Sequence, residues 1–141
     1  MSNAASEDFD LSAVVERTDG VHIVKHPLTG AATSARISIA GPEHPVRKAA
    51  VFARMRVRRA ELMNTGVLKA PDPADDDLDQ TAFIAACTLG WSGLAVDGQS
   101  LPFSVDAPIK LYSDTRFRWL RDQVLEGLDK RDAFIGACAT V

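Results

Sequence analysis

Apolar and polar residues alternate along the first third of the chain with the two-residue period of β-strands. Residues 14–18 and 21–25 are two such segments, and both are rich in the β-branched side chains that strands favour. Between them stands Asp19-Gly20, and an Asp-Gly pair is typical of tight hairpins because both loop positions favour a positive φ angle. The pattern therefore predicts a β-hairpin that turns at Asp19-Gly20.

A second turn or loop is expected at residues 27–30, which read Pro-Leu-Thr-Gly. Residues 35–40 then alternate again and predict a half-buried strand. Together these segments predict a small antiparallel β-meander within about residues 9–41. Because a lone hairpin is only marginally stable in water, other elements must cover one face of this meander.

A long amphipathic helix is predicted for residues 46–64, a stretch that contains neither Gly nor Pro. Pro42 or Pro45 would occupy its first turn, and the residues up to Gly66 would end it. Its apolar face repeats at helical spacing and consists of Val51, Phe52, Met55, Leu62 and Met63. Its other face is strongly basic and consists of Arg47, Lys48, Arg54, Arg56, Arg58 and Arg59.

Residues 89–94, which read Leu-Gly-Trp-Ser-Gly-Leu, are predicted to form the junction at which the helices meet. The polar segment before them supplies acids to the start of a helix, where the helix dipole favours negative charge. That helix would run from about residue 76 to 89 and end at Gly90, in a left-handed cap. Trp91 would follow as a large core side chain, and Gly93 would let the backbone bend close to a neighbour.

Two further helices are predicted, from about residue 115 to 127 and from about 130 to 138. The first carries an apolar stripe that consists of Phe117, Leu120, Val124 and Leu128, and Trp119 lies at the margin of this stripe. The whole pattern predicts an α+β protein of one domain. A small N-terminal antiparallel β-meander, about residues 9–41, would pack against a bundle of three to four helices in residues 42–139. Residues 1–8 are expected to be a disordered start or a tag remnant without a role in the fold.

The composition is that of an ordinary globular protein. A chain of 141 residues that is 46% hydrophobic can build a core without disulfide bonds. Its two cysteines, Cys87 and Cys138, each lie in an apolar run, which favours reduced core thiols over a disulfide or a metal site. No apolar run reaches the roughly 18 residues that a membrane span needs, and no secretory signal precedes the strands. We therefore predict a cytoplasmic location.

The polar residues do not assemble into a recognisable catalytic or metal-binding pattern. The three histidines, His22, His26 and His44, share no helical face and have no cysteine or second cluster beside them. The acids of residues 72–79 lack the glycine and glutamate positions of a calcium loop. Ser92 lacks a signal for an activating base, and no glycine-rich phosphate loop is present. The sequence thus predicts no enzyme, no cofactor and no metal.

Two features are candidates for binding a partner. The first is the basic face of the long helix, which has two possible roles. It is either a solvated face, partly neutralised by the acids of residues 72–79 in the same or a neighbouring subunit, or a docking face for an acidic protein or for nucleic acid. The net charge of −3 makes nucleic acid unlikely as a partner. The large aromatic side chains Trp91, Phe103 and Trp119 belong either to the core or to an interface that needs aromatic anchors.

The order of motifs in residues 20–138 resembles the tail assembly chaperones of long-tailed, lambda-like bacteriophages and prophages. The upstream part of the resemblance is a His-Pro-Leu-Thr-Gly turn at residues 26–30, a strand that ends at Gly41, and then a charged helix. Its downstream part consists of Leu89-Gly90-Trp91-Ser92-Gly93, Gly98, Leu101-Pro102-Phe103-Ser104, an aromatic-rich amphipathic helix with Tyr112, Phe117 and Trp119, and Phe134.

This resemblance implies a non-enzymatic role in virion assembly. Such chaperones bind the tape measure protein, keep its apolar helices from aggregating, recruit tail tube subunits and then leave. The chain would therefore act in the cytoplasm of the host bacterium, would be absent from the mature virion, and would self-associate. It would correspond to the short form of a chaperone that also exists as a longer, frameshifted product. The basic face of residues 47–59 would supply the rim of an apolar groove at Trp91 and Phe103.

Two other functions stay open from the sequence. One is a small nucleic-acid-binding regulatory protein that uses the basic helix 47–59. The other is a small enzyme, which would need a concave pocket with at least two converging ionisable groups.

Overall fold

The centre of the molecule is a three-stranded antiparallel sheet. The structure is a computed structural model that describes residues 8–67 and 72–137, and it confirms the predicted α+β class. The strand order is β2-β3-β4, with β2 at Asp19–Lys25, β3 at Ala32–Ala40 and β4 at Thr88–Ser92. The third strand therefore comes from the middle of the chain, and the sheet is not the purely local meander that the alternating pattern predicts.

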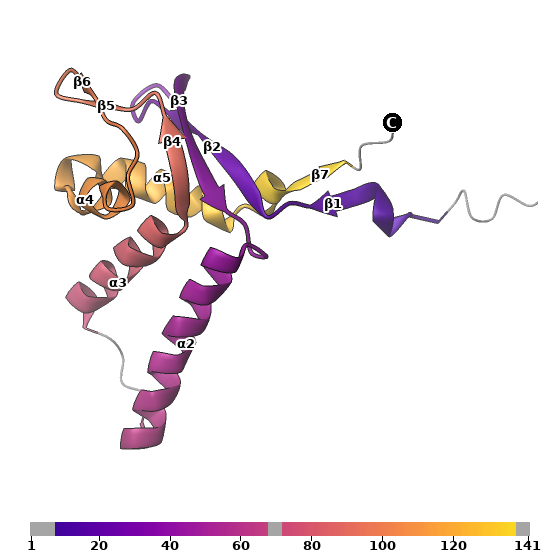
Figure 1. The fold of residues 1–141 in the computed structure, drawn as a ribbon, viewed down its shortest axis with the longest axis vertical. Helices are drawn as coiled ribbons and strands as arrows, with labels where there is room; N and C mark the ends of the chain where they lie inside the picture. Colours follow the sequence, from indigo (N-terminus) through magenta and orange to yellow (C-terminus); the bar gives the residue numbers. More distant parts are fainter. Residues whose placement is uncertain (1–7, 68–71, 138–141) are drawn as a thin grey trace, which may run out of the picture.

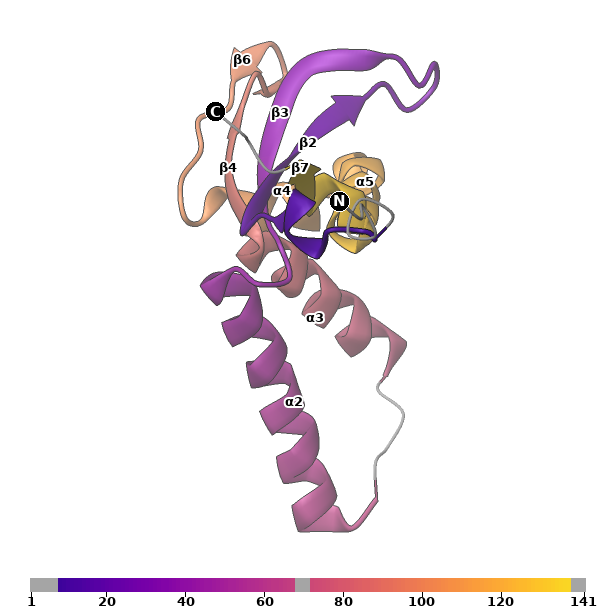
Figure 2. The same cartoon turned by 90° about the vertical axis from the view of Figure 1, so that its right-hand side faces the viewer.

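The helices divide into two groups around this sheet (Figures 1 and 2). Helix α5 (Arg118–Asp129) packs on β2 and β3, and α4 (Ala107–Ser113) packs against α3 and α5. Helices α2 (Pro45–Thr65) and α3 (Pro73–Ala86) leave the end of the sheet and extend away from it side by side. The molecule thus has a compact body and a two-helix arm.

The core lies between one face of the sheet and α5. Ile37 and Ile39 of β3 are fully buried there, and they meet Val124 and Leu128 of α5. Leu120 is also buried, so the predicted stripe of α5 is confirmed, with Phe117 half-buried at its start. At 37% exposed, Trp119 lies at the margin of the core, as predicted.

The predicted hairpin turn at Asp19-Gly20 is wrong, because both residues lie inside β2. The preceding strand β1 (Val14–Glu16) pairs instead with β7 (Ile135–Ala137) from the other end of the chain. A Cβ atom on Gly20 would lie 2.7 Å from the carbonyl oxygen of Ala133 and 2.9 Å from the ring of Phe134. Glycine is present at this position because the chain packs closely there, not because it turns.

The turn predicted at residues 27–30 is confirmed. β2 reverses into β3 through residues 26–31, where the amide of Gly30, at φ 73°, donates to the carbonyl of His26 over 2.8 Å. The Asp97-Gly98 pair joins the short strands β5 (Ala95–Val96) and β6 (Gln99–Ser100), and both of its φ angles are positive. Of the two Asp-Gly pairs in the sequence, the pair at residues 97–98 forms a turn and the pair at residues 19–20 does not.

The predicted helix junction at residues 89–94 is also wrong. Helix α3 ends at Ala86, and Thr88–Ser92 form strand β4, with Trp91 opposite Ile37 and Gly90 opposite Ser38. Gly90 has no positive φ and has open space where a Cβ atom would lie. Gly93, in contrast, has a φ of 75° and passes close to the backbone of β3, which agrees with the close approach expected of it.

Helix α2 agrees with its local signals. Pro45 is its first residue, the side chain of His44 accepts a hydrogen bond from the amide of Val46, and Gly66 ends it with a φ of 73°. No residue of this 21-residue helix is buried. Most of its predicted apolar face is therefore exposed rather than packed on the body: Val51 is half-buried, whereas Phe52, Met55, Leu62 and Met63 are exposed.

The predicted last helix at residues 130–138 is wrong in its described part. Residues Arg131–Phe134 form a short 3₁₀ helix, η3, and β7 follows directly. The same helix type occurs at η1 (Leu11–Ala13) and at η2 (Thr115–Phe117), which leads into α5. Phe134 is fully buried and ties this end of the chain to the core. Cys138, residues 1–7 of the predicted disordered start and residues 68–71 lie outside the described residues.

Candidate interaction surfaces

Two of the three candidate aromatic residues meet at the edge of the sheet. The rings of Trp91 and Phe103 lie 5.0 Å apart between centroids at an interplanar angle of 86°, an edge-to-face contact. The indole Nε1–H of Trp91 donates a hydrogen bond to the carbonyl of Leu101 over 2.9 Å. Trp91 is half-buried against the core, while Phe103 is exposed. This pair therefore fixes the segment that follows the β5–β6 hairpin.

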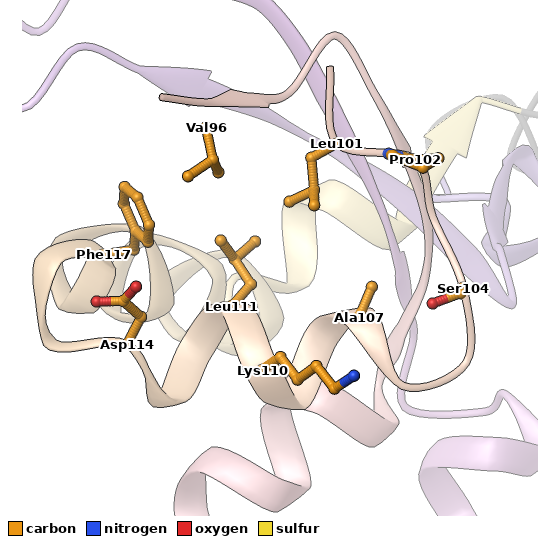
Figure 3. Close-up of a pocket in the computed structure, with 9 residues that line it drawn as sticks. All are labelled: Val96, Leu101, Pro102, Ser104, Ala107, Lys110, Leu111, Asp114 and Phe117. Carbon is orange, nitrogen blue, oxygen red and sulfur yellow. The ribbon is translucent and has the colours of Figure 1, made fainter. Parts of the chain in front are cut away.

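Beside this pair lies an apolar groove of about 390 Å³ between the β5–β6 segment and α4 (Figure 3). In Figure 3, Val96 and Leu101 face Leu111 and Phe117 across the groove. The lining residues, which we call the hairpin groove, are Val96, Leu101, Pro102, Ser104, Ala107, Lys110, Leu111, Asp114 and Phe117. Since six of these nine residues are apolar, the groove fits a row of apolar side chains better than a polar ligand.

The carboxylate of the hairpin groove, on Asp114, is held by a neighbouring arginine. Hydrogen bonds from Arg116 hold the pKa of Asp114 below its usual value, so this carboxylate is ionised and already engaged. Burial raises the pKa of the Cys87 thiol to about 11 and that of the Tyr112 hydroxyl to about 12, which keeps both groups protonated at neutral pH. Neither of these two residues lines the groove.

The first half of the basic face is used within the molecule. Arg47 donates from Nη1 to the carbonyl oxygens of Ala40 and Leu128, at 3.1 and 3.0 Å, and lies over the ring of Phe134. Lys48 pairs with Glu43 at 2.5 Å. Arg47 therefore fixes the start of α2 to the body, and it is a structural residue in this fold.

Arg54 joins α2 to α3. Its guanidinium forms an ion pair with Asp79 at 2.8 Å and lies 4.7 Å from the centroid of the Phe83 ring. One acid of residues 72–79, Asp79, therefore neutralises part of the basic face within the same chain, which was one of the alternatives left open by the sequence.

The second half of the basic face is exposed. Among the described residues, Arg56, Arg58 and Arg59 form no ion pair. Arg56 and Arg59 border a shallow hollow with Phe52 and Met55, which are 51% and 60% exposed. Large apolar side chains alternate here with free guanidinium groups, a composition typical of protein interfaces.

The structure separates the two halves of the expected binding surface. The second half of α2 lies at the end of the arm, whereas the hairpin groove lies on the body, next to β5, β6 and α4 (Figure 1). The basic face of residues 47–59 therefore does not form a rim around Trp91 and Phe103. Trp119 lies on α5, and it is not part of either surface.

Several residues of these surfaces were missed by the sequence analysis. No helix was predicted over residues 107–113, so Ala107, Lys110 and Leu111 were not considered for a site. Pro108 at the start of α4 and the apolar spacing of Ala107 and Leu111 are the signals that would have found it.

Other polar contacts stabilise the body. Gln123 of α5 accepts from the His22 ring at 3.2 Å and donates to the carbonyl of Lys25 at 2.8 Å, which joins α5 to β2. Arg121, almost fully buried, donates to Asp77 and Thr81 of α3, each at 2.9 Å. These side chains hold the helices in place and leave the two surfaces unobstructed.

No family model, characterised protein or solved structure matches this chain. Within residues 8–67 and 72–137, no three His, Cys, Asp or Glu side chains gather closely enough to hold a metal ion. Among the helices that the structure describes, none combines the length and apolar character that crossing a lipid bilayer requires.

Proposed function

We propose that the protein is a tail assembly chaperone of a long-tailed bacteriophage or prophage, with a non-enzymatic role. It binds the apolar helices of the tape measure protein and helps to recruit tail tube subunits in the cytoplasm of the host bacterium. It leaves before the virion is complete. The sequence resemblance in residues 20–138 motivates this proposal, and the hairpin groove is the structural observation that supports it.

The groove has the properties that a holdase for apolar helices needs. Its walls come from Val96 and Leu101 on one side and from Leu111 and Phe117 on the other. A ridge of side chains from an amphipathic helix fits such a space, because residues three and four positions apart project from one face of the helix. The Trp91–Phe103 contact fixes one wall, so the groove is formed before a partner arrives.

The test is co-expression of the chain with a fragment of a tape measure protein, with solubility of the fragment as the readout. Replacing a groove residue by a charged one, Val96→Asp, should abolish the gain in solubility because it places an unpaired charge in an apolar contact. Val105→Asp is the matched control: Val105 is 91% exposed, lies a few residues beyond Leu101, and does not line the groove.

Circular dichroism of both variants checks that the fold is kept. If the wild-type chain leaves the fragment insoluble, the proposed function is wrong. If Val96→Asp rescues the fragment as well as Val105→Asp does, binding occurs elsewhere and the groove assignment fails.

The three free arginines of α2 support a second candidate function, nucleic-acid binding. Three phosphate contacts predict only a shallow dependence of affinity on salt, with a slope of about −3 on double-stranded DNA. A mobility-shift series in increasing salt measures this slope, and the absence of a shift at low salt excludes the function.

A further inference from the structure

One side of α2 is left free by the contact of this helix with α3. Arg54 meets Asp79 and Phe83, which defines the side of α2 that faces α3. Successive residues of a helix turn by about 100°, so side chains about 140–180° away from Arg54 project on the opposite side. No other described helix or strand lies along that side (Figures 1 and 2). We call the four large side chains there the outer stripe: Phe52, Arg56, Arg59 and Met63.

The outer stripe is regular and exposed. Its residues follow one another in steps of four, three and four, which is the spacing along which two helices pack. From Phe52 to Met63 it extends over about 16 Å, or about three helical turns. These two apolar side chains are 51% and 79% exposed, and neither Arg56 nor Arg59 forms an ion pair with another described residue. The stripe also borders a hollow of about 390 Å³ next to Met55.

The charges of the outer stripe determine which helix complements it. Phe52 and Met63 stand at its ends, and the two guanidinium groups stand between them. A partner that covers the stripe removes water from these guanidinium groups, which is unfavourable unless carboxylates pair with them. Arginine binds a carboxylate through two parallel hydrogen bonds, so one acid for each arginine suffices. The matching helix therefore carries an apolar residue, two acids and a second apolar residue, again in steps of four, three and four.

Other ligands with negative charge fit the outer stripe less well. A phosphate backbone pairs with Arg56 and Arg59 but leaves Phe52 and Met63 without an apolar contact. A helix that lies in the surface of a lipid bilayer carries its apolar residues on one face and its charges on the other. The outer stripe has its arginines between its apolar residues, so a bilayer would have to take up charge together with the apolar side chains. An acidic amphipathic helix satisfies both kinds of residue.

We propose that the outer stripe binds an amphipathic helix of a different protein, and that this helix presents two acids between two apolar residues at the stated spacing. The inference goes beyond the proposed function, because it involves neither the hairpin groove nor a tape measure fragment. The arm and the groove are then separate binding sites. A negative result at one site leaves the other unaffected.

The test is an NMR titration of the isotope-labelled full chain with a synthetic helical peptide of about 20 residues, a length at which an isolated helix is populated. The peptide consists of alanine and glutamine, with Leu, Glu, Glu and Leu at the stated spacing. It should shift the amide signals of residues 52–63 and leave those of the hairpin groove unchanged. A peptide with Gln in place of both Glu should bind at least about tenfold more weakly.

Three results would overturn the proposal. The first is a Glu peptide that leaves the signals of residues 52–63 unchanged, also where a DNA duplex or vesicles of phosphatidylglycerol shift them. The second is a Gln peptide that binds as tightly as the Glu peptide. The third is binding that does not weaken in 1 M salt, where the Debye length is only about 3 Å.

Charge reversal assigns the binding to the two arginines. Arg56→Glu/Arg59→Glu should lose the Glu peptide and bind a peptide with Lys in place of both Glu, which the wild-type chain does not bind. Arg58→Glu is the matched control, because Arg58 lies one turn after Arg54 and thus on the side of α3. This variant should bind the Glu peptide like the wild-type chain.

All three substituted arginines are exposed, so circular dichroism should show an unchanged fold. If the double variant fails to fold, the Glu and Gln peptides on the wild-type chain decide the question. A folded double variant that still binds the Glu peptide as tightly as the wild-type chain does would place the binding elsewhere and overturn the proposal.

Discussion

Two glycines of the central sheet should respond in opposite ways to the same substitution. A Cβ atom at Gly20 would lie 2.7 Å from a backbone oxygen and 2.9 Å from the Phe134 ring, so the neighbours would have to move. Overpacking of this kind costs about 1–3 kcal/mol. At Gly90 nothing lies within 4 Å and the backbone is extended, so Gly90→Ala should stabilise the fold by about 0.4–1 kcal/mol through a less flexible unfolded chain.

Urea denaturation followed by tryptophan fluorescence measures both effects. In a thermal melt of a chain of this size, 1 kcal/mol corresponds to about 2–4 °C in Tm, so Gly20→Ala should also lower Tm by several degrees. The sign of the stability change at Gly90 distinguishes a strand from a helix end. If Gly90 ended a helix in the left-handed region, Gly90→Ala would destabilise the fold by about 1 kcal/mol instead of stabilising it. A loss at Gly90 as large as that at Gly20 would refute the strand assignment of residues 88–92.

Three further predictions concern single side chains. Trp91→Phe should cost about 1–2 kcal/mol in a urea melt, because the ring keeps most of its packing but loses the hydrogen bond to Leu101; an unchanged midpoint would contradict this. Burial lowers the pKa of His22 below 6.5, so the unfolded chain binds a proton at this residue more tightly than the folded chain does, and the free energy of unfolding falls as pH drops below about 6.5. His22→Gln should flatten this dependence of stability on pH, and an unaltered dependence would show that His22 does not cause it. Tyr112 is the single tyrosine, and its absorbance titration should have a midpoint of about 12 in the folded chain against about 10 in denaturant, with stability falling as pH rises between these values; a native midpoint of 10 would contradict its burial.

The elements with local signals could be predicted from the sequence. Pro45 and Gly66 mark the ends of α2, and the apolar stripe of α5 repeats every three to four residues. The turn at residues 27–30 is likewise encoded locally, by Pro27 at its start and Gly30 at its end. In each case the deciding interactions lie within a few residues of the pattern.

The elements that depend on distant partners could not be predicted in this way. Asp19-Gly20 and Asp97-Gly98 are the same dipeptide, yet only the second forms a turn, because Phe134 packs against Gly20 from more than a hundred residues away. The strand at residues 88–92 is a short run of small and apolar residues that fits a helix end equally well. Its pairing with β3 decides the outcome.

The residues that line the hairpin groove were not among the predicted binding residues. Trp91 and Phe103 do meet, and Arg56 and Arg59 are exposed. Arg47, from the same basic run, instead binds the carbonyl oxygens of Ala40 and Leu128. The charge of an arginine does not tell whether its guanidinium group stabilises the fold or is exposed for binding. The difference depends on whether backbone carbonyl groups lie within hydrogen-bond distance in the folded chain, as they do for Arg47.

The lack of any buried residue in α2 has a consequence for how this helix stays folded. Most of the stability of a helix in a protein comes from tertiary packing of one of its faces, and α2 gains little from such packing beyond Arg47 and Arg54. The turns after Arg54 should therefore open and close readily, and their amide hydrogens should exchange with solvent much faster than those of α5. A partner that packs against these turns would stabilise them and slow the exchange of their amide hydrogens. The exchange rates of α2 would therefore show whether a partner is bound.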